Sequence, residues 1–248
     1  MKNILLADGP VGFQVCEWLI ANYRDDIGLI VVTGDNEIKC VADAGGVPCA
    51  IYTAEQALLA VARSHGEAFD WGFLVWWPHI IGKSLIALPR HGFINTHPSL
   101  LPYNRGKHYN FWALVEQAPF GVSLHMVEAG IDCGDIIAQV PIGYDWEDTG
   151  ATLYAKASAA ISELFKATYP QIREGRIVRT PQDLMQGSFH LAKELEPASR
   201  IDLDAMYRAR DLLNLLRART FPGYPACRFR ERDGQEYEVR VEIRRKDK

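Results

Sequence analysis

The stretch GFINTHPSLLPYNRGKHYNFWALVEQAPFGVSLHMVEAGIDCGDIIAQ, residues 92–139, carries the side chains around which the rest of the chain is arranged. Asn95 and His97 stand two residues apart at the end of a short apolar run, and Pro98 stops the strand after them. Residues i and i+2 of a strand point to one face, so a carboxamide and an imidazole are expected side by side. Asp132 follows after one helix-like and one strand-like segment.

These three side-chain types suit acyl transfer. An amide can donate to an oxyanion, an imidazole can act as a base, and a carboxylate can orient that base. A single Asn-x-His pair is more often a capped strand end with a satisfied histidine. The later aspartate makes that interpretation less attractive, so we predict Asn95, His97 and Asp132 as catalytic residues.

Apolar runs alternate with amphipathic segments through the first 140 residues. Strands are expected at 3–7, 29–33, 48–52, 71–75, 93–97, 121–126 and 136–140. Helices are expected at 11–23, 37–45, 54–64 (with Thr53 as its N-cap) and 111–116. This alternation predicts an α/β fold with a Rossmann-like, mostly parallel sheet covered on both faces.

The rest of the chain predicts a long helix and a small appendage. The helix is expected at 152–173, followed by an irregular linker at 182–200, a second helix at 203–220, and a β-hairpin formed by 226–230 and 237–243. We therefore predict a catalytic Rossmann-like domain at 1–180. Residues 181–248 would form a C-terminal region of linker, helix and hairpin.

Composition predicts an ordinary soluble globular protein. The chain has 248 residues, 48% of them hydrophobic and 23% charged, with a net charge of −4. That charge gives no general electrostatic attraction to nucleic acid, although a local basic patch stays open. Its five cysteines are scattered and form no CxxC pair, which disfavours a disulfide framework or a zinc site and fits a cytoplasmic location. Cys133 could be taken for a nucleophile, but the sequence places no base specifically beside it to activate the thiol. We expect no signal peptide and no membrane-spanning helix.

Two motifs together resemble a known family. NTHPSLLPYNRG (residues 95–106) followed by GVSLHMVEAGIDCGDII (residues 121–137) is similar to the signature of the formyltransferases that use N10-formyltetrahydrofolate. That family includes phosphoribosylglycinamide formyltransferase, methionyl-tRNA formyltransferase and the sugar N-formyltransferases. The resemblance implies the formyltransferase fold, N10-formyltetrahydrofolate as formyl donor, and catalytic roles for the three residues named above.

An aromatic loop follows the fourth predicted strand and has two interpretations. One is core packing at a sheet edge. The other, favoured by the resemblance, is a wall for the pterin of the formyl donor. On that second interpretation the cofactor-binding residues are Trp76, Trp77, Pro78, His79, Ile80, Ile81 and Leu88.

Two further segments are predicted to bind the substrate. Gly9-Pro10-Val11-Gly12 is no dinucleotide fingerprint, but Asp8 and Gly9 lie at the end of the first strand, where such sheets bind ligands. A polar, positively charged loop contributes Asn104, Arg105, Lys107 and Tyr109, which would suit an anion such as a diphosphate, or would form a solvated loop. His125 is expected to be a packed strand histidine, and no metal is predicted.

The length of the C-terminal region favours one acceptor. Methionyl-tRNA formyltransferase is usually longer and more basic, and phosphoribosylglycinamide formyltransferase usually stops soon after the catalytic region. The layout most resembles the sugar N-formyltransferases, which implies a nucleotide-linked amino sugar, a homodimer and a role in surface polysaccharide such as O-antigen. A formyltetrahydrofolate hydrolase and a non-catalytic folate- or nucleotide-binding module are the alternatives.

Overall fold

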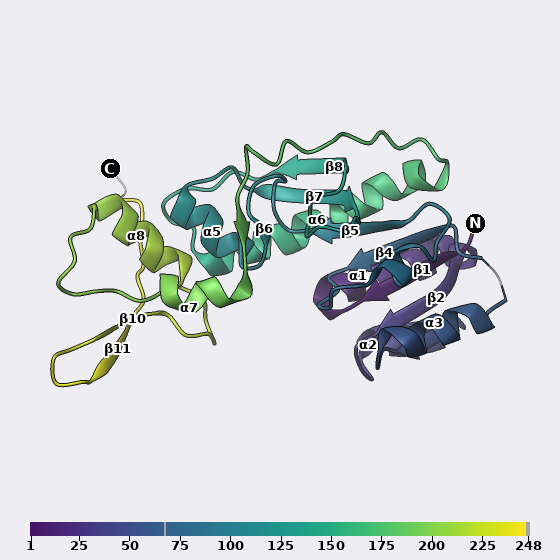
Figure 1. Cartoon of the computed structure of the whole chain (residues 1–248), viewed down its shortest axis with the longest axis horizontal. Helices are drawn as coiled ribbons and strands as arrows, with labels where there is room; N and C mark the ends of the chain where they lie inside the picture. The colour runs from purple at the N-terminus through teal and green to yellow at the C-terminus, as the bar shows by residue number, and fades with distance from the viewer. Residues whose placement is uncertain (67, 247–248) are drawn as a thin grey trace. The chain divides into compact units, whose positions relative to one another are not determined.

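The computed structural model describes residues 1–66 and 68–246 and is built on a seven-stranded sheet (Figure 1). Its strand order is β3-β2-β1-β4-β5-β7-β8. The pairs β1/β2, β1/β4, β2/β3 and β4/β5 are parallel, and β5/β7 is antiparallel. The strands are β1 (Asn3–Ala7), β2 (Ile27–Val32), β3 (Cys49–Ile51), β4 (Trp71–Val75), β5 (Phe93–His97), β7 (Gly121–Met126) and β8 (Ile136–Pro141). The predicted mostly parallel α/β sheet is confirmed.

Several of the parallel strands form where the sequence has apolar runs. β1 and β4 are buried at every residue, as expected for parallel strands that are covered on both faces. The bounds predicted for β1, β4, β5 and β7 agree with the structure, whereas β2, β3 and β8 differ by one or two residues at an end. These differences are of the size expected for frayed ends and do not change the topology.

Four helices connect the parallel strands. They are α1 (Gly9–Tyr23), α2 (Glu37–Ala44), α3 (Glu55–Ser64) and α4 (Lys83–Ile86), and the short 3₁₀ helix η1 (Arg24–Asp26) follows α1. Asn36 caps α2, where its side-chain oxygen accepts from the backbone N–H groups of Ile38 and Lys39 at 3.1 and 3.2 Å. The predicted cap of α3 is wrong, because α3 begins one residue later. Ala54 takes the N-cap position, and no side chain caps the helix.

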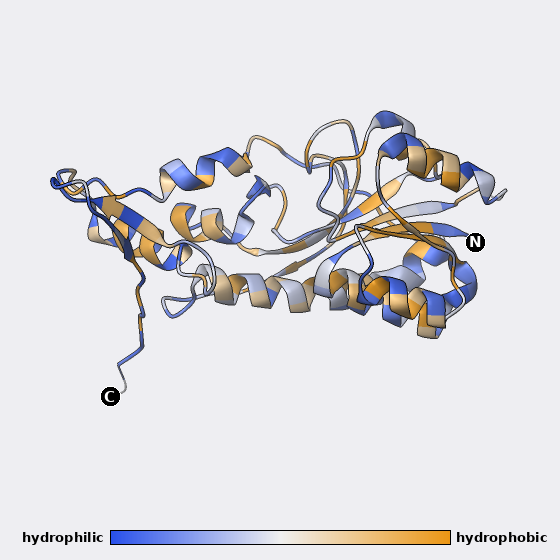
Figure 2. Ribbon diagram, turned by 90° about the horizontal axis from the view of Figure 1, so that it is seen from below, coloured by the Kyte–Doolittle hydropathy of each residue, from blue (hydrophilic) through white to orange (hydrophobic). Residues whose placement is uncertain are grey.

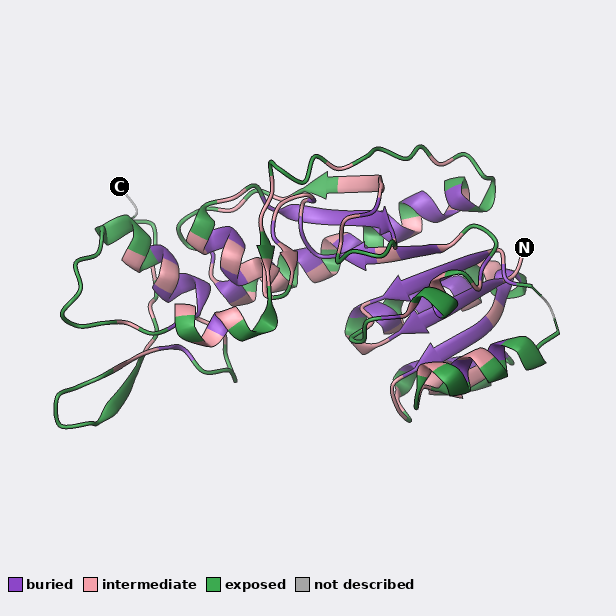
Figure 3. Cartoon of the chain, in the orientation of Figure 1, coloured by how far each residue is buried: buried purple, intermediate pink, exposed green. Residues whose placement is uncertain are grey.

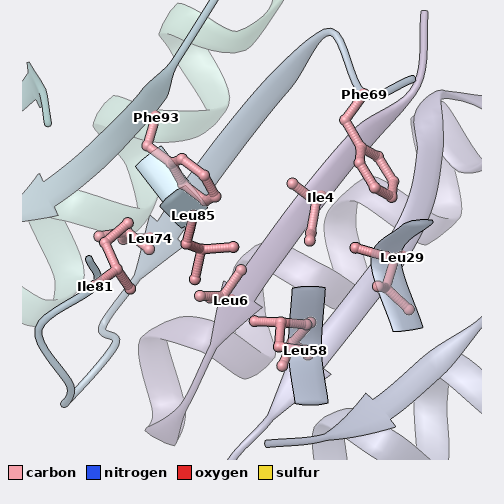
Figure 4. Close-up of a cluster of buried hydrophobic side chains, with 11 residues drawn as sticks. Ile4, Leu6, Leu29, Leu58, Phe69, Leu74, Ile81, Leu85 and Phe93 are labelled. Carbon is pink, nitrogen blue, oxygen red and sulfur yellow. The ribbon is translucent and has the colours of Figure 1, made fainter. Parts of the chain in front are cut away.

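A cluster of aliphatic and aromatic side chains fills the space between the sheet and its helices (Figure 4). β1 contributes Ile4 and Leu6, α3 contributes Leu58, and β5 contributes Phe93, all of them buried. Figure 3 shows burial along the central strands, and Figure 2 shows that hydrophobic and hydrophilic residues alternate along the helices. Removal of this apolar surface from water is the main force that fixes β4 and β5 beside β1.

The chain divides into two compact units. The first contains Met1–His97, Ser123–Gln139 and Ala159–Gln182, and the second contains Pro98–Val122, Val140–Ser158 and Asp183–Lys248. The helix α6 (Gly150–Arg173) therefore contributes residues to both units. Among the described residues, no helix combines the length and apolar character needed to cross a membrane.

The second unit contains the predicted C-terminal helix and hairpin. Its elements are β6 (Arg105–Gly106), α5 (Tyr109–Glu116), β9 (Phe189–His190), η2 (Ala192–Glu194), α7 (Leu195–Ala198), α8 (Ala209–Ala218), β10 (Cys227–Arg230) and β11 (Glu236–Val239). β10 and β11 form an antiparallel hairpin, as predicted. The linker prediction is wrong in part, because residues 182–200 contain β9, η2 and α7 rather than irregular chain alone.

The helix α8 starts six residues later than predicted. Asp202 accepts from the backbone N–H of Asp204 at 3.0 Å, and this local turn competes with a helix. As a result, Leu203 and Tyr207 lie before the helix and are exposed, although Tyr207 was expected on its apolar side.

Candidate active site

The end of β5 presents the polar side chains of Asn95 and His97, which alternate with Thr96. Asn95 and His97 follow the buried residues Phe93 and Ile94, and the His97 side chain is only 6% exposed. β7 runs antiparallel beside β5 and places His125 directly opposite Asn95. Side chains of directly paired residues lie on the same face of a sheet, so His125 joins the two predicted residues.

Asp132 reaches this group from the turn between β7 and β8. Its backbone has a positive φ of 49°, a left-handed conformation that non-glycine residues adopt only in special turns. Its carboxylate oxygens lie 3.4 Å from His97 Nδ1, 3.4 Å from Asn95 Nδ2 and 3.5 Å from His125 Nε2. The structure thus brings Asn95, His97 and Asp132 together as the sequence motifs suggested, and adds His125.

The sequence interpretation of His125 was incomplete. His125 is a buried strand histidine, as expected, but its ring also faces Asn95 at 3.1 Å and Asp132 at 3.5 Å. Neither motif contains a signal that singles it out. Strand alternation in residues 121–126, combined with a pairing of β5 and β7, would have placed it on the face of Asn95.

The arrangement can hold and move a proton. An imidazole beside a carboxylate is the usual way to orient a base and to stabilise its charged form, and an amide next to both supplies a hydrogen-bond donor. His97, His125 and Asp132 also offer three potential metal-ligand atoms within 4.8 Å of one another. However, His125 Nε2, the atom that a metal would need, lies 3.1 Å from the side-chain nitrogen of Asn95. The absence of a metal stays a prediction.

The aromatic loop after β4 has some residues packed in the core and others exposed to solvent. Ile81 is buried in the hydrophobic cluster, with Trp77 and Leu88 packed against it. His79 stacks on the Tyr52 ring with 5.2 Å between centroids, whereas Ile80 is 82% exposed. Core packing thus accounts for part of this loop. The pterin-binding role of Trp76, Trp77, Pro78, His79, Ile80, Ile81 and Leu88 stays a prediction.

Trp76 and Gly9 meet at the rim of the sheet. Trp76 has a φ of 58°, and its backbone N–H donates to Thr96 Oγ1 at 3.1 Å. A Cβ on Gly9 would lie 3.3 Å from the Trp76 ring, so the first turn and the aromatic loop are in contact. Asp8 accepts a hydrogen bond from the Thr33 hydroxyl at 2.9 Å. Asp8 and Gly9 are thus held by contacts within the first unit. Their role in binding substrate stays a prediction.

The predicted substrate loop lies in the second unit. Asn104 is buried, and its side-chain amide donates to Glu116 at 2.9 Å and to Ser188 at 3.2 Å. Arg105 lies with its guanidinium 5.8 Å from the Phe189 ring centre, whereas Lys107 is exposed. Burial raises the pKa of Tyr109 well above its usual value. Asn104 thus has a structural task here, and the role of these four residues in binding stays a prediction.

Two cations act on His108 of the same loop, and one of them, Arg219, is paired with Glu196. Burial, followed by the charges of Arg219 and Lys107, lowers the pKa of His108 below its usual value. The cations that disfavour a charged imidazole would favour an anionic group. This observation is compatible with the predicted diphosphate site.

Comparison with protein families identifies the class of protein. Residues 52–168 match the formyl transferase family, and residues 194–245 match the N-formyltransferase dimerization C-terminal domain. The first match contains all four polar residues of the site, and together the two matches cover more than half of the chain. The chain belongs to the formyltransferase family, and it is a formyltransferase.

Solved structures share the fold over nearly the whole chain. A Mycobacterium tuberculosis protein for which sugar N-formyltransferase activity has been suggested is 22% identical, covers 100% of this chain and 99% of its own, and has a TM-score of 0.82. A 4-N formyltransferase from Francisella tularensis is 21% identical, with 98% of both chains covered and a TM-score of 0.80. An N-formyltransferase from Helicobacter canadensis, in complex with folinic acid and dTDP-3-aminofucose, is 17% identical, with 91% of this chain and 83% of its own covered and a TM-score of 0.70. At these identities the likeness establishes the formyltransferase fold.

Proposed function

We propose that this enzyme transfers a formyl group from N10-formyltetrahydrofolate to the primary amine of a nucleotide-linked amino sugar. The observation that carries the proposal is the convergence of Asn95, His97 and Asp132 at the end of β5, within a chain of the formyltransferase family. In the Helicobacter canadensis structure, a folate derivative and a nucleotide-linked amino sugar occupy a related fold, which supports this donor and acceptor class.

Each of the three residues has a task in the transfer. The amine nitrogen forms a bond to the formyl carbon, and the bond from that carbon to N10 of the folate breaks. Asn95 donates a side-chain N–H to the formyl oxygen as it gains negative charge, and loss of one such donor typically lowers the rate ~10²–10³-fold. His97 accepts the proton that the amine releases, and Asp132 stabilises the charged imidazole. The proton that N10 needs returns through this pair.

The aromatic loop fits the chemistry of the formyl donor. A pterin is a flat heterocycle that offers ring faces for stacking and nitrogen and oxygen atoms for hydrogen bonds. The loop offers the rings of Trp76, Trp77 and His79, and the Trp77 indole N–H is buried without an acceptor in the described part of the chain. These residues would bind and orient the folate, which supplies the activated formyl group.

The C-terminal region favours an amino sugar over the other acceptors. The match to an N-formyltransferase dimerization domain at residues 194–245 supports a sugar N-formyltransferase that works as a homodimer. Six large apolar side chains of that region are exposed and would suit a subunit contact: Leu203, Met206, Tyr207, Leu213, Tyr224 and Tyr237. A cytoplasmic location, a role in O-antigen synthesis and the absence of nucleic-acid or membrane partners stay predictions.

One assay tests donor, acceptor and reaction together. The protein is incubated with N10-formyltetrahydrofolate and a panel of dTDP-, UDP- and GDP-linked 3-amino and 4-amino sugars, and products are measured by mass spectrometry. We expect one sugar to gain the mass of one formyl group. Release of formate without any amine would instead identify a hydrolase. Formylation of phosphoribosylglycinamide or of methionyl-tRNA, but of no sugar, would reassign the acceptor.

A further inference from the structure

The buried ring of His125 is held in one tautomer by the main chain. Its Nδ1 lies 2.8 Å from the carbonyl oxygen of Met126. A carbonyl oxygen can only accept a hydrogen bond, so Nδ1 carries the hydrogen. In the neutral ring Nε2 is then left as an acceptor. This assignment follows from the partner of the ring and needs no observed hydrogen atom.

The tautomer of His125 decides how the Asn95 carboxamide is turned. Nε2 faces one end of that carboxamide at 3.1 Å. If the amide oxygen stood there, two acceptors would meet without a hydrogen between them, so the NH2 end must face His125. The same NH2 group lies 3.4 Å from Asp132 Oδ1, which is also an acceptor. Both neighbours therefore favour the same orientation. The contact with Asp132 is longer than a usual N–H···O hydrogen bond, so the second amide hydrogen stays available to the formyl oxygen.

The surroundings leave His125 little freedom to change this arrangement. It is 2% exposed and pairs with Asn95 across two adjacent strands. The His97 ring stands edge-on to it, with 6.0 Å between centroids. A buried ring with its backbone in a sheet ladder cannot turn without breaking the bond to Met126. His125 is thus a rigid template for the more exposed Asn95.

We infer that His125 is a positioning residue, which keeps the donor end of Asn95 directed into the site for formyl transfer. This inference rests on the proposed function. Asn95 needs its NH2 group to stabilise the formyl oxygen, whereas its own amide oxygen would repel that charge. Without His125 the carboxamide can adopt both orientations, and Asp132 alone favours the productive one.

Kinetics with four variants test the inference. His125→Ala should lower kcat by about 10-fold or more, up to the ~10²–10³-fold loss expected for Asn95→Ala, and leave both KM values nearly unchanged. His125→Gln should recover part of the rate, because its side-chain oxygen can accept from Asn95. In the Asn95→Ala background, His125→Ala should cause no further loss. Equal activity of His125→Ala and wild type, or fully multiplicative losses in the double variant, would overturn the inference.

A matched control and a spectroscopic measurement separate this outcome from failure of the proposed function. His91 is an exposed histidine that contacts Trp71, and His91→Ala should keep full activity. Side-chain ¹⁵N NMR of the wild-type protein should show a protonated Nδ1 and a bare Nε2 for His125, whatever reaction the enzyme catalyses. A protonated Nε2 would overturn the inference. A wild-type enzyme that formylates no amine, but shows the expected tautomer, would refute the proposed function and leave the geometry of His125 intact.

Discussion

The side-chain amide of Gln182 donates to the main-chain carbonyl oxygen of Asp132 at 3.0 Å, although the two residues lie 50 positions apart in the sequence. The same nitrogen donates to the carbonyl oxygen of Gly134 at 2.6 Å. Gln182 therefore clamps both ends of the tight turn that presents the Asp132 carboxylate. The chain just before it is fixed by two backbone hydrogen bonds between Thr180 and Ile136, at 2.8 and 2.9 Å.

Gln182→Glu should lower formyl transfer without unfolding the protein. The variant keeps the size of the side chain but loses both donor hydrogens, and it brings an anion against two carbonyl oxygens. The left-handed turn at Asp132 would then relax, and we expect kcat to fall about 10-fold, as is common when a supporting hydrogen bond of an active site is removed. Steady-state kinetics and circular dichroism measure both effects. Gln171→Ala on the exposed face of α6 is the control, and a fully active Gln182→Glu would show that the clamp is dispensable.

His97→Ala and Asp132→Asn should fold and yet lose formyl transfer by at least about 10²-fold, the usual contribution of a positioned acid or base. In the proposed mechanism His97 accepts the amine proton. Asp132→Asn keeps the shape but cannot stabilise the charged imidazole at 3.4 Å. Single-turnover formylation monitored by mass spectrometry gives the rate of the chemical step. Near-full activity in either variant would remove that residue from the mechanism.

The sequence predicted the parts of this molecule that depend on local pattern. β1 and β4 are apolar runs with turn-forming residues at their ends, and Pro98 ends β5 directly after His97, so their bounds were predictable. Asp132 was placed near His97 by two motifs read together. His125 and Gln182 were missed because each acts through a partner that is distant in sequence, across a strand pair or along a connecting segment. Their side-chain types carry no signal until β5, β7 and the turn at Asp132 are assembled.

Gly72→Ala should destabilise the first unit by about 1–3 kcal/mol, the usual cost of overpacking a core. Gly72 pairs with Phe93 across β4 and β5, and a Cβ at Gly72 would lie only 2.4 Å from the Phe93 ring. Urea unfolding measures the loss. Gly34→Ala, where a Cβ meets nothing within 4 Å, should be close to neutral. Because the clash is with the ring, Phe93→Leu should cost less stability in the Gly72→Ala background than alone.

Asp148→Asn should remove stability at neutral pH but not in acid. Burial alone would raise the pKa of Asp148, but hydrogen bonds from Lys156, the Asp145 N–H and Thr152 outweigh it and lower the pKa below its usual value. A carboxyl group whose pKa is lower when folded stabilises the protein above its unfolded pKa of ~3.9, and this stabilisation fades as pH falls through the folded value. We expect a loss of about 1–3 kcal/mol in the free energy of unfolding at pH 7.

The test is the pH dependence of the difference between wild type and Asp148→Asn. Chemical unfolding at several pH values should show the two proteins converging as the pH falls from about 4 through the lower pKa of the folded carboxyl. Glu163→Gln, which alters an exposed ion pair with Lys166, should change stability little at any pH. A difference that stayed constant from pH 7 to pH 3 would mean that charge at Asp148 does not contribute.

Cys40→Ser should abolish the fast phase of thiol labelling in the native protein. Cys40 is exposed, whereas burial raises the pKa of Cys49 to about 11 and that of Cys227 to about 12, and raises that of the buried Cys16 further still. Only the thiolate reacts, so at pH 8 a thiol of pKa 11 is reactive in roughly one molecule in a thousand. Labelling with a chromogenic disulfide measures the phases, and unfolding in guanidinium should release all remaining thiols. A fast phase that survives in Cys40→Ser would assign the reactivity to Cys133, the half-buried neighbour of Asp132. Formyl transfer measured after labelling would then show whether that thiol lies beside the active site.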